Sequence, residues 1–336
     1  MALVLVLILV PFVPSFRVMD MVAKIMIFTV VVASYDLILG YTGLLSFAHA
    51  MFFGIGAYSV ALICYYSGAP QWYHLILATM ASLLISVFLA LVLAFFSLRT
   101  KAIFFAMLSL ALADFFHLLG MTWSDLTLGE DGVTFSLPGI LNVKWSGLNL
   151  LGIQLTPRMM TYYLILVVAV ALFLGLLRFV RSPVGRVLKS IRDNEQRSTA
   201  LGYKTFRYQI YSIVFGSSIA SLGGILFALW IRFVDPESAL GVFGMVDYLL
   251  MLIIGGLGTL YGSIIGATFF MATQAWLPDL LKGIATFFPD YEIIHRIAER
   301  WIAFLGLMFI VAIIVFPKGV VGTVRDKIAQ KKSTAD

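Results

Sequence analysis

The sequence has 336 residues, of which 61% are hydrophobic and only 12% charged, and its mean hydropathy is +1.01. Soluble domains are about half apolar and about a quarter charged, so this composition excludes a water-soluble fold and indicates a protein solvated by lipid. The net charge of +6 indicates basic cytoplasmic loops rather than nucleic-acid binding, and the single cysteine, Cys64, excludes an internal disulfide. No cluster of cysteine and histidine suggests a metal site.

The N-terminal stretch from Met1 to Phe16 is apolar but has neither a basic n-region nor a small-residue cleavage site. We interpret it as a short first span rather than a signal peptide, and Pro11 and Pro14 weaken it because proline removes a backbone donor. A spanning helix needs about 20 mostly apolar residues. Apolar runs predict an all-α integral membrane fold of about ten transmembrane helices, at residues 2–16, 18–39, 43–66, 72–98, 102–120, 159–180, 209–231, 242–256, 260–277 and 301–316.

Charge divides the segments between these runs into two groups. Residues 178–207 carry a net charge of +6 and the tail from Pro317 carries +3, whereas 121–158, 232–241 and 278–300 each carry −1. The positive-inside rule places the two basic segments in the cytoplasm and the three acidic segments outside. Ten spans with both termini in the cytoplasm satisfy these assignments, and Arg17, which would lie outside, is the one exception.

Small residues recur at every fourth position in three stretches assigned to spans. The sets are Ser46, Ala50 and Gly54; Gly216, Ala220 and Gly224; and Gly258, Gly262 and Gly266. This spacing lets helix backbones approach closely in lipid. We interpret each stripe as packing within one subunit, with a translocation pathway or a subunit interface as the alternative.

Five ionisable residues lie within or at the ends of the predicted spans: Asp36, His49, Asp114, His117 and Asp247. A central Asp costs about 2.5–3.5 kcal/mol on insertion scales, so each should face protein or a water-filled cavity. We favour hydrogen bonds that tie helices together, and a proton relay is the alternative. The acidic loop from Leu128 to Gly132 could bind a cation or an outside protein, or simply turn; it lacks EF-hand spacing, so calcium is not expected.

The basic segment between the sixth and seventh runs has the pattern of two short capped helices. Ser182 and Pro183 suit the N-cap and first position of a helix whose apolar face is Val184, Val187, Leu188 and Ile191. Asn194 can cap a second helix that Gly202 would end. This helix–turn–helix is too polar to span. We favour a docking surface for a cytoplasmic partner, with a lipid-surface helix or a plain topological loop as alternatives.

The sequence contains no Walker A phosphate loop and no nucleophile elbow, and its Ser and His residues show no triad spacing. We therefore expect a transport subunit rather than an enzyme, with no cofactor bound by this chain. If ATP drives it, ATP and Mg²⁺ are bound by a separate subunit that docks on the basic segment. A stand-alone secondary transporter driven by protons through Asp36, Asp114 or Asp247 is the alternative.

Six segments, taken in order, point to one family. Residues 40–58 read GYTGLLSFAHAMFFGIGAY and residues 182–202 read SPVGRVLKSIRDNEQRSTALG; the other four are 104–114, 129–132, 255–267 and 316–322. Their order and spacing resemble the LivM-type permease subunits of bacterial branched-chain amino-acid ABC importers. The chain departs from the family pattern at Ala48, Ser109, Asp114 and Glu130.

The resemblance implies an ABC importer permease bundle with a cytoplasmic coupling loop. Its transmembrane permease domain would cover residues 1–317, with the coupling loop at 181–207, an external loop at 121–158 and a basic cytoplasmic tail at 318–336. It implies a multi-pass protein of the bacterial inner membrane whose partners are a homologous permease in a heterodimer, two cytoplasmic ATPase subunits and a periplasmic or lipid-anchored substrate-binding protein. Leucine, isoleucine and valine are the implied solutes, and urea or short amides are the alternative.

Three groups of site residues follow. Those expected to couple to the ATPase subunits are Pro183, Gly185, Arg186, Ile191, Arg192, Asn194, Glu195, Ala200 and Gly202. Those expected in the translocation pathway or in helix packing are Gly43, Ser46, His49, Gly54, Asp114, Gly255, Gly256, Gly258 and Gly262. Contact with the external receptor is expected at Glu130 and Asp131.

Overall fold

The computed structural model describes residues 7–12, 15–97, 102–142, 148–150, 153–286, 300–316 and 319–323. Within them, eight segments are long and apolar enough to cross a membrane. They are α2 (Phe16–Thr42), α3 (His49–Tyr66), α4 (Trp72–Ser97), α5 (Ala102–Thr122), α7 (Pro157–Arg181), α10 (Thr205–Ile231), α13 (Leu260–Thr286) and Trp301–Thr323, which begins with α15 (Trp301–Val315). A shorter apolar helix, α12 (Val242–Gly255), precedes α13.

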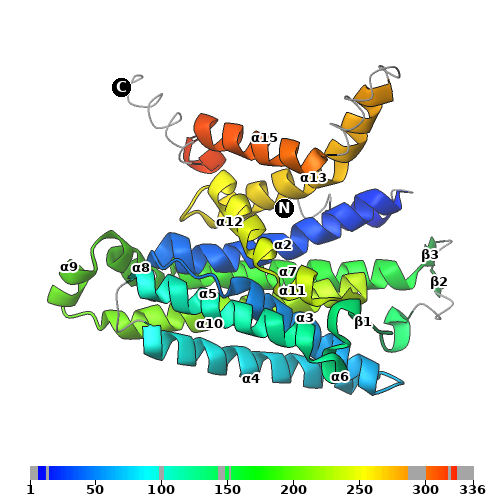
Figure 1. The fold of residues 1–336 in the computed structure, drawn as a ribbon, viewed down its shortest axis with the longest axis horizontal. Helices are drawn as coiled ribbons and strands as arrows, with labels where there is room; N and C mark the ends of the chain where they lie inside the picture. The colour runs from blue at the N-terminus through cyan, green and yellow to red at the C-terminus, as the bar shows by residue number, and fades with distance from the viewer. Residues whose placement is uncertain are drawn as a thin grey trace.

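Short elements join these helices at the two ends of the bundle (Figure 1). At one end lie α8 (Pro183–Asp193) and α9 (Glu195–Ala200), and the other end carries α6 (Ser124–Thr127). The 3₁₀ turns η2 (Gly129–Asp131) and η3 (Gly139–Leu141) follow α6 in the chain, and α11 (Pro236–Leu240) packs against α3 and α5. Strand β1 (Val133–Thr134) pairs antiparallel with β4 (Phe233–Val234), and β2 (Leu148–Leu150) with β3 (Ile153–Leu155). The β1–β4 pair ties the loop after α5 to the segment after α10.

Helices α2, α3 and α10 form the centre of the molecule. In each of them 72% of the most apolar stretch is buried, whereas the share is at most 28% in the other five candidate spans. The outer helices expose large apolar side chains such as Ile76, Phe88 and Ile314. Such a surface is suited to contact with lipid, because the free energy of exposing so much apolar surface to water is unfavourable.

Close backbone approach holds α3 against α10. A methyl group at Gly56 would overlap the carbonyl oxygen of Ser221, and one at Gly224 would overlap the carbonyl oxygen of Phe53. Small residues let the two backbones meet directly, as the four-residue spacing predicts. The stripe through Gly216 and Gly224 therefore packs inside this chain, where its two glycines face α2 and α3 respectively.

The start of α3 differs from the sequence prediction, which placed a continuous span at 43–66. Helix α2 ends at Thr42, and Gly43 adopts a left-handed φ of 78°, which suits a residue without a Cβ. Residues 43–48 form no helix, and α3 begins only at His49. Nε2 of His49 lies 2.8 Å from Oγ of Ser34, which is well inside α2, so α3 starts within the depth of the bundle.

Nine of the ten predicted apolar runs correspond to helices of the described chain, and α13 continues nine residues beyond its predicted end, to Thr286. The first run, residues 2–16, is described only in part: residues Val10–Phe12 form a 3₁₀ turn, η1. The backbone carbonyl of Leu7 accepts a hydrogen bond from Tyr162 near the start of α7, 2.9 Å away. Most of the predicted basic tail, 318–336, lies outside the described residues, which include only 319–323 of it.

Candidate functional site

The basic segment between α7 and α10 folds as the two capped helices that the sequence predicts. Oγ of Ser182 accepts a hydrogen bond from the N–H of Gly185 at 3.4 Å, and Pro183 opens α8. Oδ1 of Asn194 accepts one from the N–H of Arg197 at 2.8 Å, at the start of α9. Because these caps satisfy backbone donors that a helix start leaves free, the segment has a defined shape.

Helix α8 has one buried and one exposed face. Gly185, Leu188 and Ile191 are buried, and a methyl group at Gly185 would overlap the carbonyl oxygen of Val180. Leu201, just after α9, is 67% exposed although it is apolar. The segment therefore presents a mixed basic and apolar surface, and the other predicted coupling residues lie on it: Pro183, Arg186, Arg192, Asn194, Glu195, Ala200 and Gly202.

Arg192 joins this surface to the interior of the bundle. Its Nη1 donates a hydrogen bond of 2.6 Å to the backbone carbonyl of Gly40, in the last turn of α2. The side chain also packs against Gly43, where a methyl group would lie 3.1 Å from its Cγ, and against Gly258, where one would lie 2.8 Å from its Nη1. Arg192, predicted in the coupling group, thus meets Gly43 and Gly258, predicted in the pathway group.

Asp36 makes a buried contact with the same turn that Arg192 reaches. Its carboxylate is fully buried, and Oδ1 accepts a hydrogen bond of 2.7 Å from the N–H of Gly258. Gly258 adopts a left-handed φ of 75° in the turn between α12 and α13. It is therefore not part of a helix face, which corrects the predicted stripe of Gly258, Gly262 and Gly266. The end of α2 and this turn are joined by Asp36 and covered by Arg192, and we call this arrangement the Arg192 junction.

Two further contacts join α2 to α3 and to α10. His49 is fully buried and shares a hydrogen bond with Ser34, as described above. Oγ1 of Thr42 lies 2.7 Å from Oγ of Ser212 on α10, also within hydrogen-bond distance. The buried polar groups at this end of the bundle thus tie helices together, which is the role that the sequence favoured for Asp36 and His49.

The small residues predicted nearby are used for close packing. A methyl group at Gly255 would overlap the carbonyl oxygen of Gly262, and one at Gly54 would overlap the side chain of Leu240. Gly256 follows α12 directly, and Ser46 is buried, where its Oγ accepts a hydrogen bond of 3.3 Å from the N–H of Ala48. The contact between Gly255 and Gly262 lets α12 cross α13 closely, and the contact between Gly54 and Leu240 lets α11 pack directly on α3.

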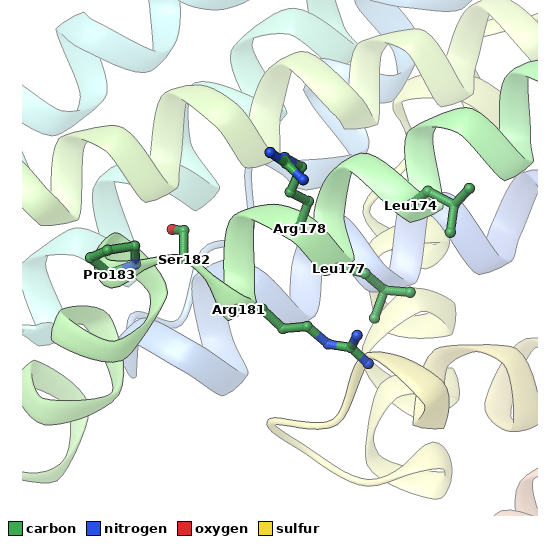
Figure 2. Close-up of a pocket in the computed structure, with 6 residues that line it drawn as sticks. All are labelled: Leu174, Leu177, Arg178, Arg181, Ser182 and Pro183. Carbon is green, nitrogen blue, oxygen red and sulfur yellow. The ribbon is translucent and has the colours of Figure 1, made fainter.

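A pocket of about 520 Å³ opens beside the junction, where α7 gives way to α8. Figure 2 shows it lined by Leu174, Leu177, Arg178, Arg181, Ser182 and Pro183, with the two guanidinium groups directed to opposite sides. Arg181 donates a hydrogen bond of 3.2 Å to the hydroxyl of Tyr261, near the start of α13. The pocket combines apolar walls with two cationic groups at the base of the exposed surface.

The remaining predicted residues lie away from this junction. Glu130 and Asp131 are exposed on η2, at the end of the bundle opposite α8 (Figure 1). Asp114 is half-buried on α5. One turn further along α5, His117 lies 3.3 Å from the carboxylate of Glu237. The structure therefore does not bring Asp114, Glu130 or Asp131 together with the coupling residues.

Sequence reasoning missed two parts of the site. The acceptor for Arg192 is the backbone carbonyl of Gly40, and the ring of Tyr41 lies 4.9 Å from the ammonium of Lys189. A signal was present in the segment 40–43, whose two glycines flank Tyr41 and Thr42 just after the predicted span 18–39. A backbone acceptor carries no side-chain signature, however, so its partner could not be read from the sequence.

Comparison with known proteins gives a consistent result. A family described as "Branched-chain amino acid transport system / permease component" matches residues 17–315. The chain is 25% identical to the high-affinity branched-chain amino acid transport system permease protein LivM of Salmonella typhimurium, covering 100% of this chain and 77% of that protein. It is 24% identical to the Escherichia coli protein of the same name, covering 97% and 75%.

A more distant match is the autoinducer 2 import system permease protein LsrC of Yersinia enterocolitica, which is 29% identical over 36% of this chain and 36% of that protein. These relatives are transport permeases rather than enzymes. No solved structure gives a significant match.

Proposed function

The chain belongs to the family of branched-chain amino acid transport permease components, a multi-pass membrane protein family, and from this premise we propose its role. It is the transmembrane permease subunit of an ATP-binding-cassette importer for branched-chain amino acids. The solute class is taken from what the two LivM relatives are named for.

The Arg192 junction is the observation that carries this proposal. Helices α8 and α9 both start with a side-chain cap and expose one face. Arg192 connects these helices to the end of α2 and to the turn before α13. A push on the exposed face is transmitted to both elements, because buried, hydrogen-bonded contacts are stiff. This is the arrangement expected of a subunit that receives work from another polypeptide.

The proposed mechanism is alternating access. Two ATPase subunits bind ATP and Mg²⁺, close against each other, and displace α8 and α9. The displacement moves the inner ends of α2 and α12, so the bundle exchanges an outward-open for an inward-open state. ATP acts only through its different affinity for these two states.

The proposed assembly has this chain paired with a homologous permease in the bacterial inner membrane. The two ATPase subunits contact the coupling loop on the cytoplasmic side, where both termini also lie. A periplasmic or lipid-anchored substrate-binding protein delivers solute at the other end, with Glu130 and Asp131 among its contacts. The basic charge of residues 178–207 supports this orientation.

The test is reconstitution of the chain with the ATPase, second permease and receptor that co-purify with it. We expect leucine uptake into proteoliposomes only when ATP is present on the side of α8. Replacing the exposed Arg186 by alanine should lower leucine-stimulated ATP hydrolysis without affecting membrane insertion. The matched control is Arg300→Ala, which removes an exposed arginine at the start of α15.

Two outcomes would contradict the proposal. One is full leucine uptake by this chain alone under a pH gradient, which would make it a secondary transporter. The other is ATP-driven uptake of urea or acetamide in preference to leucine, which would keep the importer mechanism and replace the solute.

A further inference from the structure

A second cavity, of about 350 Å³, lies toward the end of the bundle opposite α8. Its walls come from α2, α10, α11, α12 and α13. Lys24 lies in the first half of α2, Asp247 near the start of α12, and Phe227 near the end of α10. Small-molecule sites have volumes of about 300–1,000 Å³, so this cavity has room for a small solute.

The cation in this cavity is held in place by its neighbours. Nζ of Lys24 lies 2.9 Å from Oδ2 of Asp20, one turn earlier on α2. The indole N–H of Trp230 donates a hydrogen bond of 2.8 Å to the other oxygen of Asp20. A lysine ammonium has three donors, and this pairing uses one of them. Lys24 is therefore positioned with donors left for a second carboxylate.

Two carboxylates line the same cavity, those of Glu237 and Asp247. The carboxylate of Glu237 lies 3.3 Å from Nε2 of His117, whereas that of Asp247 is unpaired within the described part of the chain. Asp247 lies on the apolar helix α12, and among the described residues its carboxylate has no hydrogen-bond or ion-pair partner. A carboxylate at membrane depth is costly unless it faces a partner or water. Asp247 is thus suited to receive a cationic group that enters the cavity, and the amide of Gln274 also lines it.

Much of the remaining lining of the cavity is aromatic and apolar. The ring of Phe28 lies 6.1 Å from that of Phe227 and 5.8 Å from that of Tyr248, measured between centroids. Met251 and Met271 complete the wall. Packed rings give a rigid surface, and thioethers adapt to the shape of a branched aliphatic group.

We propose that this cavity binds the transported solute as a zwitterion, with its α-ammonium at Asp247, its α-carboxylate at Lys24 and its branched side chain on Phe28, Phe227 and the two methionines. The proposal rests on the import function above and places its solute site within this chain. A neutral amide such as urea matches neither charge nor the apolar wall, so the cavity discriminates against it.

The cavity is connected to the Arg192 junction by two continuous helices. Helix α2 carries Lys24 and Phe28 toward one end and Gly40 at the other, and α12 carries Asp247 and Tyr248 toward one end with Gly258 just past the other. Solute bound in the cavity contacts both α2 and α12 away from the Arg192 junction. The proposed displacement of α8 moves the ends of the same two helices at the junction, so solute binding and this displacement are coupled.

The test uses photo-leucine, a diazirine analogue that keeps both charged groups, on the intact importer complex without the soluble receptor. After irradiation, labelled peptides are identified by mass spectrometry. We expect label on peptides containing Phe28, Tyr248 or Met271, removed by excess leucine and retained in excess urea. Asp247→Asn and Lys24→Gln should each reduce it about tenfold, because each removes one charge-assisted contact. Asp247→Glu, which keeps the charge, should retain it.

The control is Lys282→Gln, an exposed lysine on α13 outside the cavity, which should leave the label unchanged. Undiminished labelling in both cavity variants, or equal competition by urea and leucine, overturns the zwitterion site. ATP-driven leucine uptake is measured on the same preparation. Uptake without label in the cavity refutes the site alone, whereas label without uptake keeps the site and refutes the importer function.

Discussion

The guanidinium of Arg192 lies where three segments far apart in the sequence meet: α8, the end of α2 and the turn before α13. Besides donating to the carbonyl of Gly40, it donates from Nε and Nη2 to its neighbour Asp193, at 3.2 and 3.1 Å. This use of three nitrogens suits the planar fork of arginine and cannot be copied by a single ammonium. The residue therefore acts in positioning the coupling loop on the bundle.

Replacement of Arg192 should separate ATP hydrolysis from transport. A hydrogen bond from a charged group contributes about 1.5–3 kcal/mol, so Arg192→Lys and Arg192→Gln should lower leucine uptake per ATP hydrolysed by roughly tenfold or more. Both quantities are measured in the reconstituted complex. Arg300→Gln, at an exposed position outside the coupling loop, is the control. An unchanged ratio of uptake to hydrolysis in both Arg192 variants would show that the junction does not transmit the movement.

Arg17, the one basic residue that opposed the predicted topology, is paired within the fold. Its guanidinium pairs with the carboxylate of Asp279 and donates to the backbone carbonyl of Ala275, both on α13. Arg17 therefore has partners within the chain, both of them on another helix. The pair also links the outer ends of α2 and α13.

At the scale of elements, the crossing of α3 and α10 depends on the absence of side-chain atoms. The carbonyl of Ser221 on α10 occupies the space that a side chain at Gly56 would need. In lipid there is little hydrophobic drive between helices, so their association relies on such van der Waals contact. The crossing therefore sets the position of both central helices.

Gly56→Ala should destabilise the protein, because the added methyl group forces α3 and α10 apart. Overpacking typically costs about 1–3 kcal/mol, and we expect the unfolding temperature in detergent to fall by roughly 2–10 °C. The matched control is Gly175→Ala on α7, where no atom lies within 4 Å of the new methyl group. That change should be neutral or slightly stabilising, since alanine is the better helix former. Equal thermal stability of both variants would contradict this account of the crossing.

At the scale of the whole molecule, the two ends of the bundle differ in chemistry. One end carries the basic α8–α9 surface, and the other carries the acidic η2 turn together with the cavity of Lys24 and Asp247. In the proposed mechanism, solute recognition and energy input lie in different parts of the bundle, and α2 and α12 run between them. The positive-inside rule predicts which of these ends faces the cytoplasm, and this prediction is open to direct measurement.

Cysteine labelling should distinguish the two ends. Cys64 is the single cysteine of the sequence and is buried. A Cys64→Ala background therefore contains no native thiol that could react with the label. In intact cells, a membrane-impermeant maleimide should label Glu130→Cys, whereas Thr199→Cys on α9 should react only after the membrane is permeabilised. Both positions are exposed. Labelling of the second variant from outside would reverse the orientation and remove the basis for ATPase docking at α8.

The sequence alone determined the membrane class, the approximate extent of nine helices, the caps of α8 and α9 and the family, because these depend on composition, run length and local hydrogen bonding. It could not show that α3 starts inside the bundle or that Gly258 lies in a turn. Those features depend on what residues 43–48 and 256–259 contact across the fold.

Only the tertiary structure placed Arg192 on Gly40 and set Lys24 in the same cavity as Asp247. The physical reason lies in the solvent. In water, an amphipathic stripe marks the buried face of a helix, but in lipid the buried and exposed faces are both apolar, so no stripe separates them. Which side of α2 faces α10, and which faces α13, is decided by close packing and by a few buried polar contacts between residues far apart in the chain.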